Sequence, residues 1–426
     1  MVTTNTFAHD RMCTLWEEAA ETTSMNMTLS KDLQTYTMGG MANKDRTAGG
    51  ASNTSFGAPA DNPIGDREYI PQEYRFEIKD GIETAEGDGQ NIIDRMIPVN
   101  RIRSFNVLAT IKAKELGDPQ RVTKVAQGFA RDIANKIDTI CYKEMIIRST
   151  MFVGTGAKFT YDAAIDAETL MLNRGLSRFG RKLFLSNKHY AAVAKDLSTA
   201  ARDVLVTDAL SRAKIPNLAT FDTMRSDYLI SNPAVNASDQ GSMSVNGDQE
   251  HVVATYGTDG FYKDNREMTL IMKKADFLTP GTKIKISKLN SVHPETREDT
   301  GEEMQFTVLA KNSNTSIQIT PPIIASGPYQ NVVGKALHGT GIDIINKVSD
   351  TPSLFYTPES TVIVPGRVPV IGDAIRTTTL TTENGIPMTM LYWYDGHKMQ
   401  YNMKAVVSMD VQVIYPDMLG GIYRTA

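Results

Sequence analysis

The alternation of apolar and polar residues is clearest between residues 225 and 348, where it predicts a self-contained β domain. Residues 281–289, 304–310 and 316–321 each alternate with a period of two, as half-buried strands do. Residues 312–315, Asn-Ser-Asn-Thr, supply turn chemistry between the last two runs, which therefore form a predicted hairpin. Few helix signals occur here. The pattern predicts a small barrel or sandwich inserted into a larger domain.

The longest helical pattern starts at Asp118-Pro119, an N-cap residue followed by the residue preferred at the first helical position. Apolar residues then recur at three- and four-residue spacing to about Ser149, a length of roughly 45 Å at ~1.5 Å per residue. The residues expected to pack along one face of this spine helix are Val122, Val125, Phe129, Ile133 and Ile137. Charged residues are expected to fill the other face: Arg121, Lys124, Arg131, Asp132, Lys136, Asp138 and Lys143.

Shorter elements are predicted on both sides of the spine helix. A weak amphipathic helix covers residues 12–33, and it fits an arm that packs on a neighbouring subunit as well as an ordinary surface helix. Alternating α/β units are predicted at 162–174, 181–185, 186–197 and 200–213. Strands return after the β domain at 360–364, 388–394 and 400–415. The chain therefore leaves one domain and comes back to it.

Residues 39–66 form a long polar stretch, rich in Gly, Ala, Asn, Ser and Asp, between the extended runs 34–38 and 74–78. A long loop inside an otherwise compact protein is uncommon unless it has a function. One interpretation is an extended loop that reaches onto a neighbouring subunit. The other is a disordered surface insertion.

The composition of the 426 residues, 41% hydrophobic and 22% charged, is globular and allows two or three domains. A net charge of −4 argues against strong nucleic-acid binding across the surface, because such proteins cluster Lys and Arg to neutralise phosphates. No signal peptide or membrane-spanning stretch is recognisable. We therefore expect folding in a reducing cytoplasm, with Cys13 and Cys141 as free thiols.

Patterns typical of catalytic and metal sites are missing from the sequence. The six histidines are scattered, and there is no P-loop, no Gly-x-Ser-x-Gly and no Cys-x-x-Cys. The acidic stretch around residues 83–94 lacks the spacing of an EF-hand. No catalytic residue, cofactor or metal is predicted, which is typical of a structural or binding protein.

Several short motifs follow one another in a fixed order. In the β domain they are Gly241-Ser-Met-Ser-Val-Asn-Gly247, Asp264-Asn-Arg266, Gly281-Thr-Lys-Ile-Lys-Ile286, Phe306-Thr-Val308 and Ile319-Thr-Pro321. Outside it they are residues 130–135, 166–168, 173–174, Tyr190, 196–197 and 221–222. In this collinear order the chain resembles tailed-phage major capsid proteins of the Hong Kong ninety-seven fold. It is most similar to the coat proteins of the Salmonella phage P-twenty-two group, which carry an inserted domain.

The resemblance implies an α+β tailed-phage major capsid fold, with peripheral and axial domains, a long spine helix, an extended loop, an N-terminal arm and an inserted small β-barrel domain. The implied ranges are 1–35 for the arm, 36–80 for the extended loop and its flanking strands, 81–154 with 396–426 for the peripheral domain including spine helix 118–149, 155–224 with 349–395 for the axial domain, and 225–348 for the inserted domain.

The implied function is that of a major capsid protein without enzymatic activity. It self-assembles, through a precursor shell that expands on DNA packaging, into the icosahedral head of a tailed double-stranded DNA phage. Implied partners are further copies in pentamers and hexamers, a scaffolding protein, a portal protein and the enclosed DNA, bound without sequence specificity; no membrane is involved. Assembly is expected in the host cytoplasm. The expected inter-subunit contact residues are Lys44, Asp45, Arg46, Asn246, Asp248, Glu250 and Lys263.

Two other interpretations stay open at this point. A cellular nanocompartment shell of the same fold encloses cargo enzymes instead of a genome, and the inserted domain argues against it. A β-rich phage tail or adhesion protein would use residues 226–348 to hold a ligand. The tail protein predicts a monomer or trimer, whereas the capsid protein predicts large closed particles.

Overall fold

The computed structural model describes residues 6–36, 68–76, 92–99, 103–112, 114–156, 159–200, 217–225, 243–258, 260–366 and 376–425. The chain divides into two compact units. The first comprises Met1–Glu68, Val99–Tyr142 and Thr361–Gln412, and the second comprises Tyr69–Pro98, Lys143–Ser360 and Val413–Ala426. The loop expected at 39–66 lies outside the described residues, as does almost all of the helix expected at 200–213.

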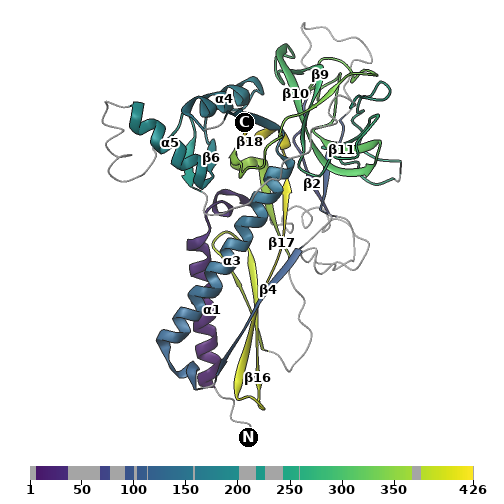
Figure 1. Cartoon of the computed structure of the whole chain (residues 1–426). Helices are drawn as coiled ribbons and strands as arrows, with labels where there is room; N and C mark the ends of the chain where they lie inside the picture. The colour runs from purple at the N-terminus through teal and green to yellow at the C-terminus, as the bar shows by residue number, and fades with distance from the viewer. Residues whose placement is uncertain are drawn as a thin grey trace, which may run out of the picture. The chain divides into compact units, whose positions relative to one another are not determined.

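The first unit combines helix α1 (Thr6–Asn26) and helix α3 (Pro119–Arg148) up to Tyr142 with a six-stranded sheet, and the end of α3 from Lys143 belongs to the second unit (Figure 1). The strand order is β1 (Gln34–Thr35), β14 (Thr361–Gly366), β17 (Gln400–Val413), β16 (Pro387–Asp395) and β15 (Arg376–Thr381), and β4 (Arg103–Lys112) also pairs with β17. β16 and β17 form an antiparallel hairpin from Met388↔Val407 to Asp395↔Gln400. The two helices lie side by side in Figure 1.

The predicted spine helix is confirmed as α3, which ends at Arg148, one residue before the predicted end. Its start is fixed as expected, because the Asp118 carboxylate accepts the backbone N–H of Gln120 at 3.0 Å. Four of the five expected packing residues are buried: Val122, Phe129, Ile133 and Ile137. Val125 is only partly buried, and the neighbouring Ala126 is fully buried instead.

α1 differs from the helix expected at 12–33, since it starts at Thr6 and ends at Asn26. A short 3-10 turn, η1 (Ser30–Asp32), follows it. Trp16 is fully buried, and its ring packs edge-on against Phe129 of α3 with 5.7 Å between the ring centroids. The apolar stripe of α1 is therefore covered by α3 within this unit.

In the second unit, a five-stranded sheet has the order β5 (Met151–Thr155), β18 (Leu419–Arg424), β13 (Ser353–Tyr356), β6 (Lys182–Leu185) and β7 (Asp222–Arg225). Helices α4 (Tyr161–Asn173) and α5 (Asn187–Ala200) belong to the same unit. Gly420 of β18 must be a glycine, because a Cβ there would lie 1.9 Å from Cζ of the buried Phe355 ring.

The β domain is built on a second five-stranded sheet, with the order β12 (Ile342–Ile344), β9 (Lys283–Val292), β10 (Asp299–Ser313), β11 (Ser316–Thr320) and β8 (Met268–Ile271). The predicted hairpin is confirmed, since β10 and β11 pair antiparallel across the turn Asn314-Thr315. Its apolar core includes Val245, Leu270, Ile284, Ile286, Phe306, Val308, Ile317 and Ile319. β2 (Glu68–Pro71) and β3 (Met96–Val99) form a separate pair.

Strand pairing groups the chain differently from the expected domain ranges. Residues 349–395 were expected in a domain apart from 396–426, yet β16 and β17 pair across that boundary because the turn of residues 396–399 joins them directly. After β17 the chain passes through a 3-10 turn at Pro416–Met418 and forms β18, which pairs with β5 and β13 instead of the first sheet. The extended run expected at 74–78 follows β2, which ends at Pro71, and only its first three residues are among the described ones.

Candidate functional site

The expected contact residues of the β domain lie on and beside a loop, residues 243–250, that is bonded to its own domain. The Asp248 carboxylate accepts the backbone N–H of His338 at 2.8 Å. Glu250 forms an ion pair with Lys335, with 2.5 Å between Oε1 and Nζ. Lys263 donates from Nζ to the Val252 carbonyl at 2.7 Å. Lys44, Asp45 and Arg46 lie outside the described residues.

Exposed apolar side chains flank this loop. The backbone N–H of Asn246 donates to the carbonyl of Ile271, and Asp248 meets the segment that contains Leu337. Ile271 is 46% exposed and Leu337 is 58% exposed. Apolar groups beside a charged loop are typical of the centre and rim of an interface. We call the surface of Asn246, Asp248, Glu250, Ile271 and Leu337 the loop surface.

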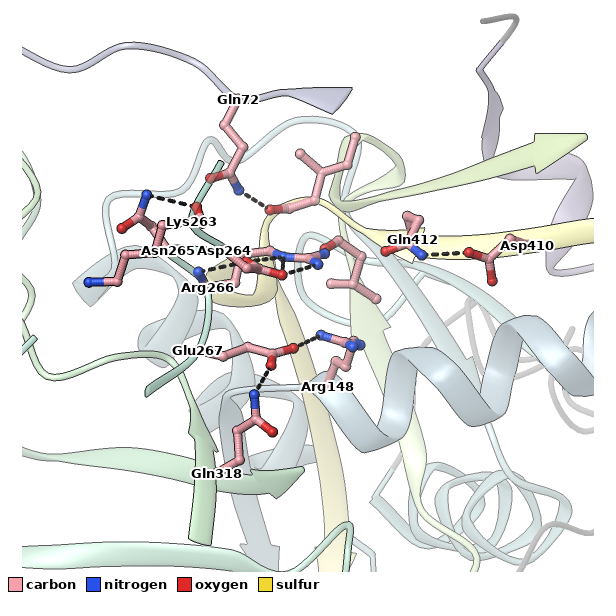
Figure 2. A network of polar contacts seen from close by, with 12 residues as sticks. Gln72, Arg148, Lys263, Asp264, Asn265, Arg266, Glu267, Gln318, Asp410 and Gln412 are labelled. Carbon is pink, nitrogen blue, oxygen red and sulfur yellow. Dashed lines mark hydrogen bonds and ion pairs between the residues drawn. The ribbon is translucent and has the colours of Figure 1, made fainter. Parts of the chain in front are cut away.

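An ion pair anchors the segment that enters β8 (Figure 2). Arg266, which is 3% exposed, donates from Nη2 to Asp264 at 2.6 Å and from Nη1 to the carbonyl of Val413 at 2.6 Å. Burial alone raises the pKa of the Asp264 carboxyl, but the ion pair and hydrogen bonds with Arg266 outweigh it and leave this pKa lowered. This pair fixes the segment to the end of β17.

The last residue of α3 contacts the β domain through a second polar group (Figure 2). Arg148 forms an ion pair with Glu267 at 2.8 Å, and Gln318 of β11 donates to the same carboxylate. A cation in the last turn also interacts favourably with the negative end of the helix dipole. The end of the spine helix is thus tied to β8 and β11.

Lys283 makes a further connection at the same helix end. It is fully buried on β9, and its Nζ lies 2.9 Å from the Ile146 carbonyl and 2.7 Å from the Ser149 carbonyl. Two hydroxyl oxygens, Ser149 Oγ at 2.8 Å and Thr307 Oγ1 at 2.9 Å, are the other oxygen atoms within hydrogen-bond distance of Nζ in the described part of the chain. Helix C-termini leave carbonyls without intrahelical partners, and this amine supplies donors to them.

The hydrogen bonds around Lys283 favour the ammonium form, although burial opposes it. The Ser149 hydroxyl donates its proton to the carbonyl of Ile146, and the Thr307 hydroxyl donates its proton to the carbonyl of Ser149. Both hydroxyl oxygens therefore accept from Nζ. Burial lowers the pKa of Lys283 well below its ordinary value. Lys283 is a buried amine surrounded by neutral oxygen atoms.

Asp138 corrects the expected polar face of the spine helix, because it is 0% exposed. Its two carboxylate oxygens accept four hydrogen bonds from the segment after α1. The backbone N–H groups of Thr28 and Ser30 both donate at 2.8 Å, and their hydroxyls donate at 2.9 and 2.5 Å. Asp138 therefore fixes the end of the N-terminal segment to α3.

The structure also brings together a serine, a histidine and an aspartate that sequence reasoning did not connect. Ser353 Oγ lies 2.7 Å from His189 Nδ1, and His189 Nε2 lies 3.2 Å from Asp350. Burial would raise the pKa of Asp350, but the hydrogen bond from His189 and backbone N–H groups lower it. Ser353 is 0% exposed and also accepts the backbone N–H of Ser186 at 3.0 Å. The group joins α5 to β13, and its serine does not meet solvent.

Among the described residues, no group of three or more His, Cys, Asp and Glu side chains could hold a metal ion. No helix in the described part of the chain is long and apolar enough to cross a membrane.

Sequence comparison decides the family. The sequence model of the family described as "P22 coat protein - gene protein 5" matches residues 58–423, which include the β domain and both of its flanks. The chain belongs to the P22 coat protein family. No curated protein matches the chain.

Solved structures similar to this coat protein chain include a single domain and whole capsid subunits. The CUS-3 coat protein I-domain is 37% identical over 25% of this chain and 97% of that chain, with a TM-score of 0.22. The capsid protein of cyanophage P-SCSP1u is 10% identical over 88% and 91%, with a TM-score of 0.42. The mature capsid of bacteriophage PhiM1 is 9% identical over 85% and 82%, with a TM-score of 0.41.

Family membership settles the main role of the chain. It is a major capsid protein with an α+β tailed-phage capsid fold, and its copies assemble into the icosahedral shell of a phage head. Its place is the virion capsid. The resemblance inferred from collinear motifs is confirmed.

Proposed function

We propose that this coat protein assembles first into a precursor shell, together with a scaffolding protein and a portal, and that the shell expands as double-stranded DNA is packaged. Pentamers and hexamers form in the host cytoplasm, and the subunit itself performs no chemistry. The net charge of −4 supports this proposal, because a strongly basic lining would bind the DNA and hinder its packaging. A buried serine in the Ser353–His189–Asp350 group supports the absence of catalysis.

Within the shell, we assign the expected domains and contacts as follows. Residues 39–66 overlap a neighbouring subunit, and the α1 segment is the N-terminal arm. The loop surface contacts a second subunit across a twofold axis, where the same patch meets itself. Its support is the combination of a loop fixed to its own domain with exposed charged and apolar side chains. A preorganised loop loses little conformational freedom on assembly.

Expression in bacteria, with and without the gene product encoded upstream of the chain, tests the function. We expect closed particles of uniform size by negative-stain electron microscopy when both are present, and irregular or fewer particles without the upstream product. A monomer or trimer under both conditions would favour the tail or adhesion interpretation. Packaged cargo enzymes in place of DNA would favour a nanocompartment.

A charge exchange tests the loop surface. Glu250→Lys breaks the ion pair with Lys335, and the double variant Glu250→Lys with Lys335→Glu restores a pair of opposite charges within the domain. We expect the double variant to unfold within about 0.5 kcal/mol of the wild type, because the pair is solvent-exposed. Its shells should still form several-fold more slowly, because residue 250 then presents a positive charge to groups of the neighbouring loop surface that keep their own charges, such as Asp248.

Light scattering and electron microscopy measure assembly, and urea titration of the unassembled subunit measures stability. The double variant leaves the net charge unchanged, and Lys274→Glu, a charge reversal outside the loop surface, tests whether a reversal elsewhere on the subunit slows assembly as well. Normal assembly of the double variant would show that Glu250 acts only within its own domain.

A further inference from the structure

A cavity of 90 Å³ lies within the second unit, between the β2 side of the unit, the end of α4, the β domain and the C-terminal segment. Four arginines line it: Arg75, Arg95, Arg174 and Arg266. The acidic residues in its lining are Glu73 and Asp417. Arg266 is already neutralised by Asp264, so the remaining lining is positively charged. The volume exceeds what one water molecule needs and suits a small polar ion.

The amide side chains around the cavity already donate hydrogen bonds to backbone carbonyls of the protein. Gln72 donates to the carbonyl of Ile414, and Asn265 donates to Ala254 and Lys263. Gln330 donates to Val332, and Asn331 donates to Pro322. These amides therefore support the walls of the cavity. The buried side-chain N–H donors of the lining that have no partner in the described part of the chain belong to Arg95 and Arg174.

Arg174 is the decisive residue. It is only 6% exposed, and its Nε–H has no hydrogen-bond partner. Its guanidinium group forms no hydrogen bond or ion pair with any of the described residues. A buried guanidinium without a partner costs several kcal/mol, which a bound anion would offset.

Arg95 is a second arginine of the lining with a buried donor that forms no hydrogen bond to the described residues, and it comes from another segment of the chain. Its Nε–H is buried and has no partner among the described residues, and its guanidinium carbon lies 4.5 Å from the centre of the Tyr329 ring. The ring covers one face of the guanidinium and leaves its edge donors unused. Burial lowers the pKa of both Arg95 and Arg174, and the attraction of Asp417 opposes this shift. Asp417 is exposed and forms no ion pair with either arginine in the described part of the chain.

We propose that this cavity is a binding site for a small oxyanion of the phosphate class, held by Arg174 and Arg95 with Arg75 at its mouth. Guanidinium groups match the oxygen pairs of a phosphate in a planar, two-bond geometry. Three arginines suit a tetrahedral dianion better than a single carboxylate. The bound anion connects the segments after β2 and before β3 to the end of α4, and it stabilises the subunit. The site is independent of the assembly steps proposed above.

Thermal unfolding of the full-length, unassembled subunit tests the site, with inorganic phosphate as the probe. Phosphate should raise the melting temperature in a saturable manner, beyond the effect of sodium chloride at matched ionic strength. Acetate should give a clearly smaller shift. Equal shifts with phosphate and chloride, or with phosphate and acetate, would overturn the proposal.

Variants assign the effect to residues. Arg174→Gln and Arg95→Gln should each raise the dissociation constant for phosphate by about tenfold or more. Asp417→Asn should lower it by about threefold, because it removes a negative charge from the lining. Arg178→Gln changes an exposed arginine outside the cavity and should leave it unchanged.

Asp417→Asn keeps the test informative if an arginine variant does not fold. Weaker phosphate binding in Asp417→Asn would overturn the proposal, as would unchanged binding in both arginine variants. Loss of binding in Arg178→Gln would place the anion elsewhere and would also overturn it.

Discussion

Asp138→Ala should destabilise the unassembled subunit by about 4 kcal/mol and release α1 and the segment after it from the spine helix. The carboxylate accepts four hydrogen bonds, two of them from backbone N–H groups of Thr28 and Ser30. Hydrogen bonds to a charged group contribute about 1.5–3 kcal/mol each, and a buried donor left without a partner costs about 1–3 kcal/mol. The hydroxyls can turn toward other acceptors, so the backbone donors dominate the loss.

Urea titration gives the stability change, and tryptophan fluorescence gives its location. Trp16 is fully buried against Phe129, so release of α1 should shift its emission to longer wavelength before the rest of the subunit unfolds. Hydrogen exchange in α1 should accelerate in parallel.

Asp132→Ala is the matched control on the same helix. Asp132 is exposed, with a 3.6 Å ion pair to Arg131, and its loss should change stability by less than about 0.5 kcal/mol. If Asp138→Ala and Asp132→Ala were equally stable, the carboxylate of Asp138 would not hold the segment after α1.

The position of Asp138 shows which features of the spine helix apolar periodicity predicts and which it does not. Apolar spacing located the spine helix to within one residue at each end, because a long amphipathic stripe and an N-cap are strong local signals. The residue type alone assigned Asp138 to the polar face. Its spacing from Ala134 and Cys141, both fully buried, places it on the apolar stripe instead. A charged residue on such a stripe signals a partner that the rest of the chain must supply.

Strands were predicted where residues alternate and missed where local propensity is weak. β18 contains Gly420 and Gly421, and glycine disfavours strands, yet the approach of Phe355 requires Gly420. Lys283 follows the period-two pattern of β9, which places it on a solvent face. The end of α3 covers that face, and the residues next to Lys283 in the sequence do not reveal a contact with a segment so far away along the chain.

Buried polar groups thus make the long-range connections of this capsid subunit, while apolar patterns form its separate elements. Asp138 binds the arm segment, Lys283 and Arg148 bind the β domain to the end of α3, and Arg266 binds the same domain to the end of β17. An inserted domain attached through such groups is fixed in place as the subunit folds. The loop surface that we propose for contacts between subunits belongs to this anchored domain.

Lys283→Ala should destabilise the subunit by about 3 kcal/mol, whereas Lys283→Met should cost less than about 1 kcal/mol. Alanine removes the buried methylene stem and leaves a cavity, at about 0.8 kcal/mol per methylene group before the cavity itself is counted. Methionine fills the same space. The carbonyls of Ile146 and Ser149 keep hydrogen bonds from the hydroxyls of Ser149 and Thr307, and the cost of the buried cation disappears.

The pH dependence separates the charge of Lys283 from its packing. Its folded-state pKa lies well below the ordinary value of 10.5, so above the folded pKa the unfolded state binds more protons than the folded state. The wild-type free energy of unfolding should therefore rise as the pH increases from the folded pKa toward 10.5, relative to Lys283→Met. Lys285→Met, a partly exposed lysine on the same strand, should keep the wild-type profile. Parallel profiles for wild type and Lys283→Met between pH 7 and about 10 would show that the buried amine does not titrate in this range.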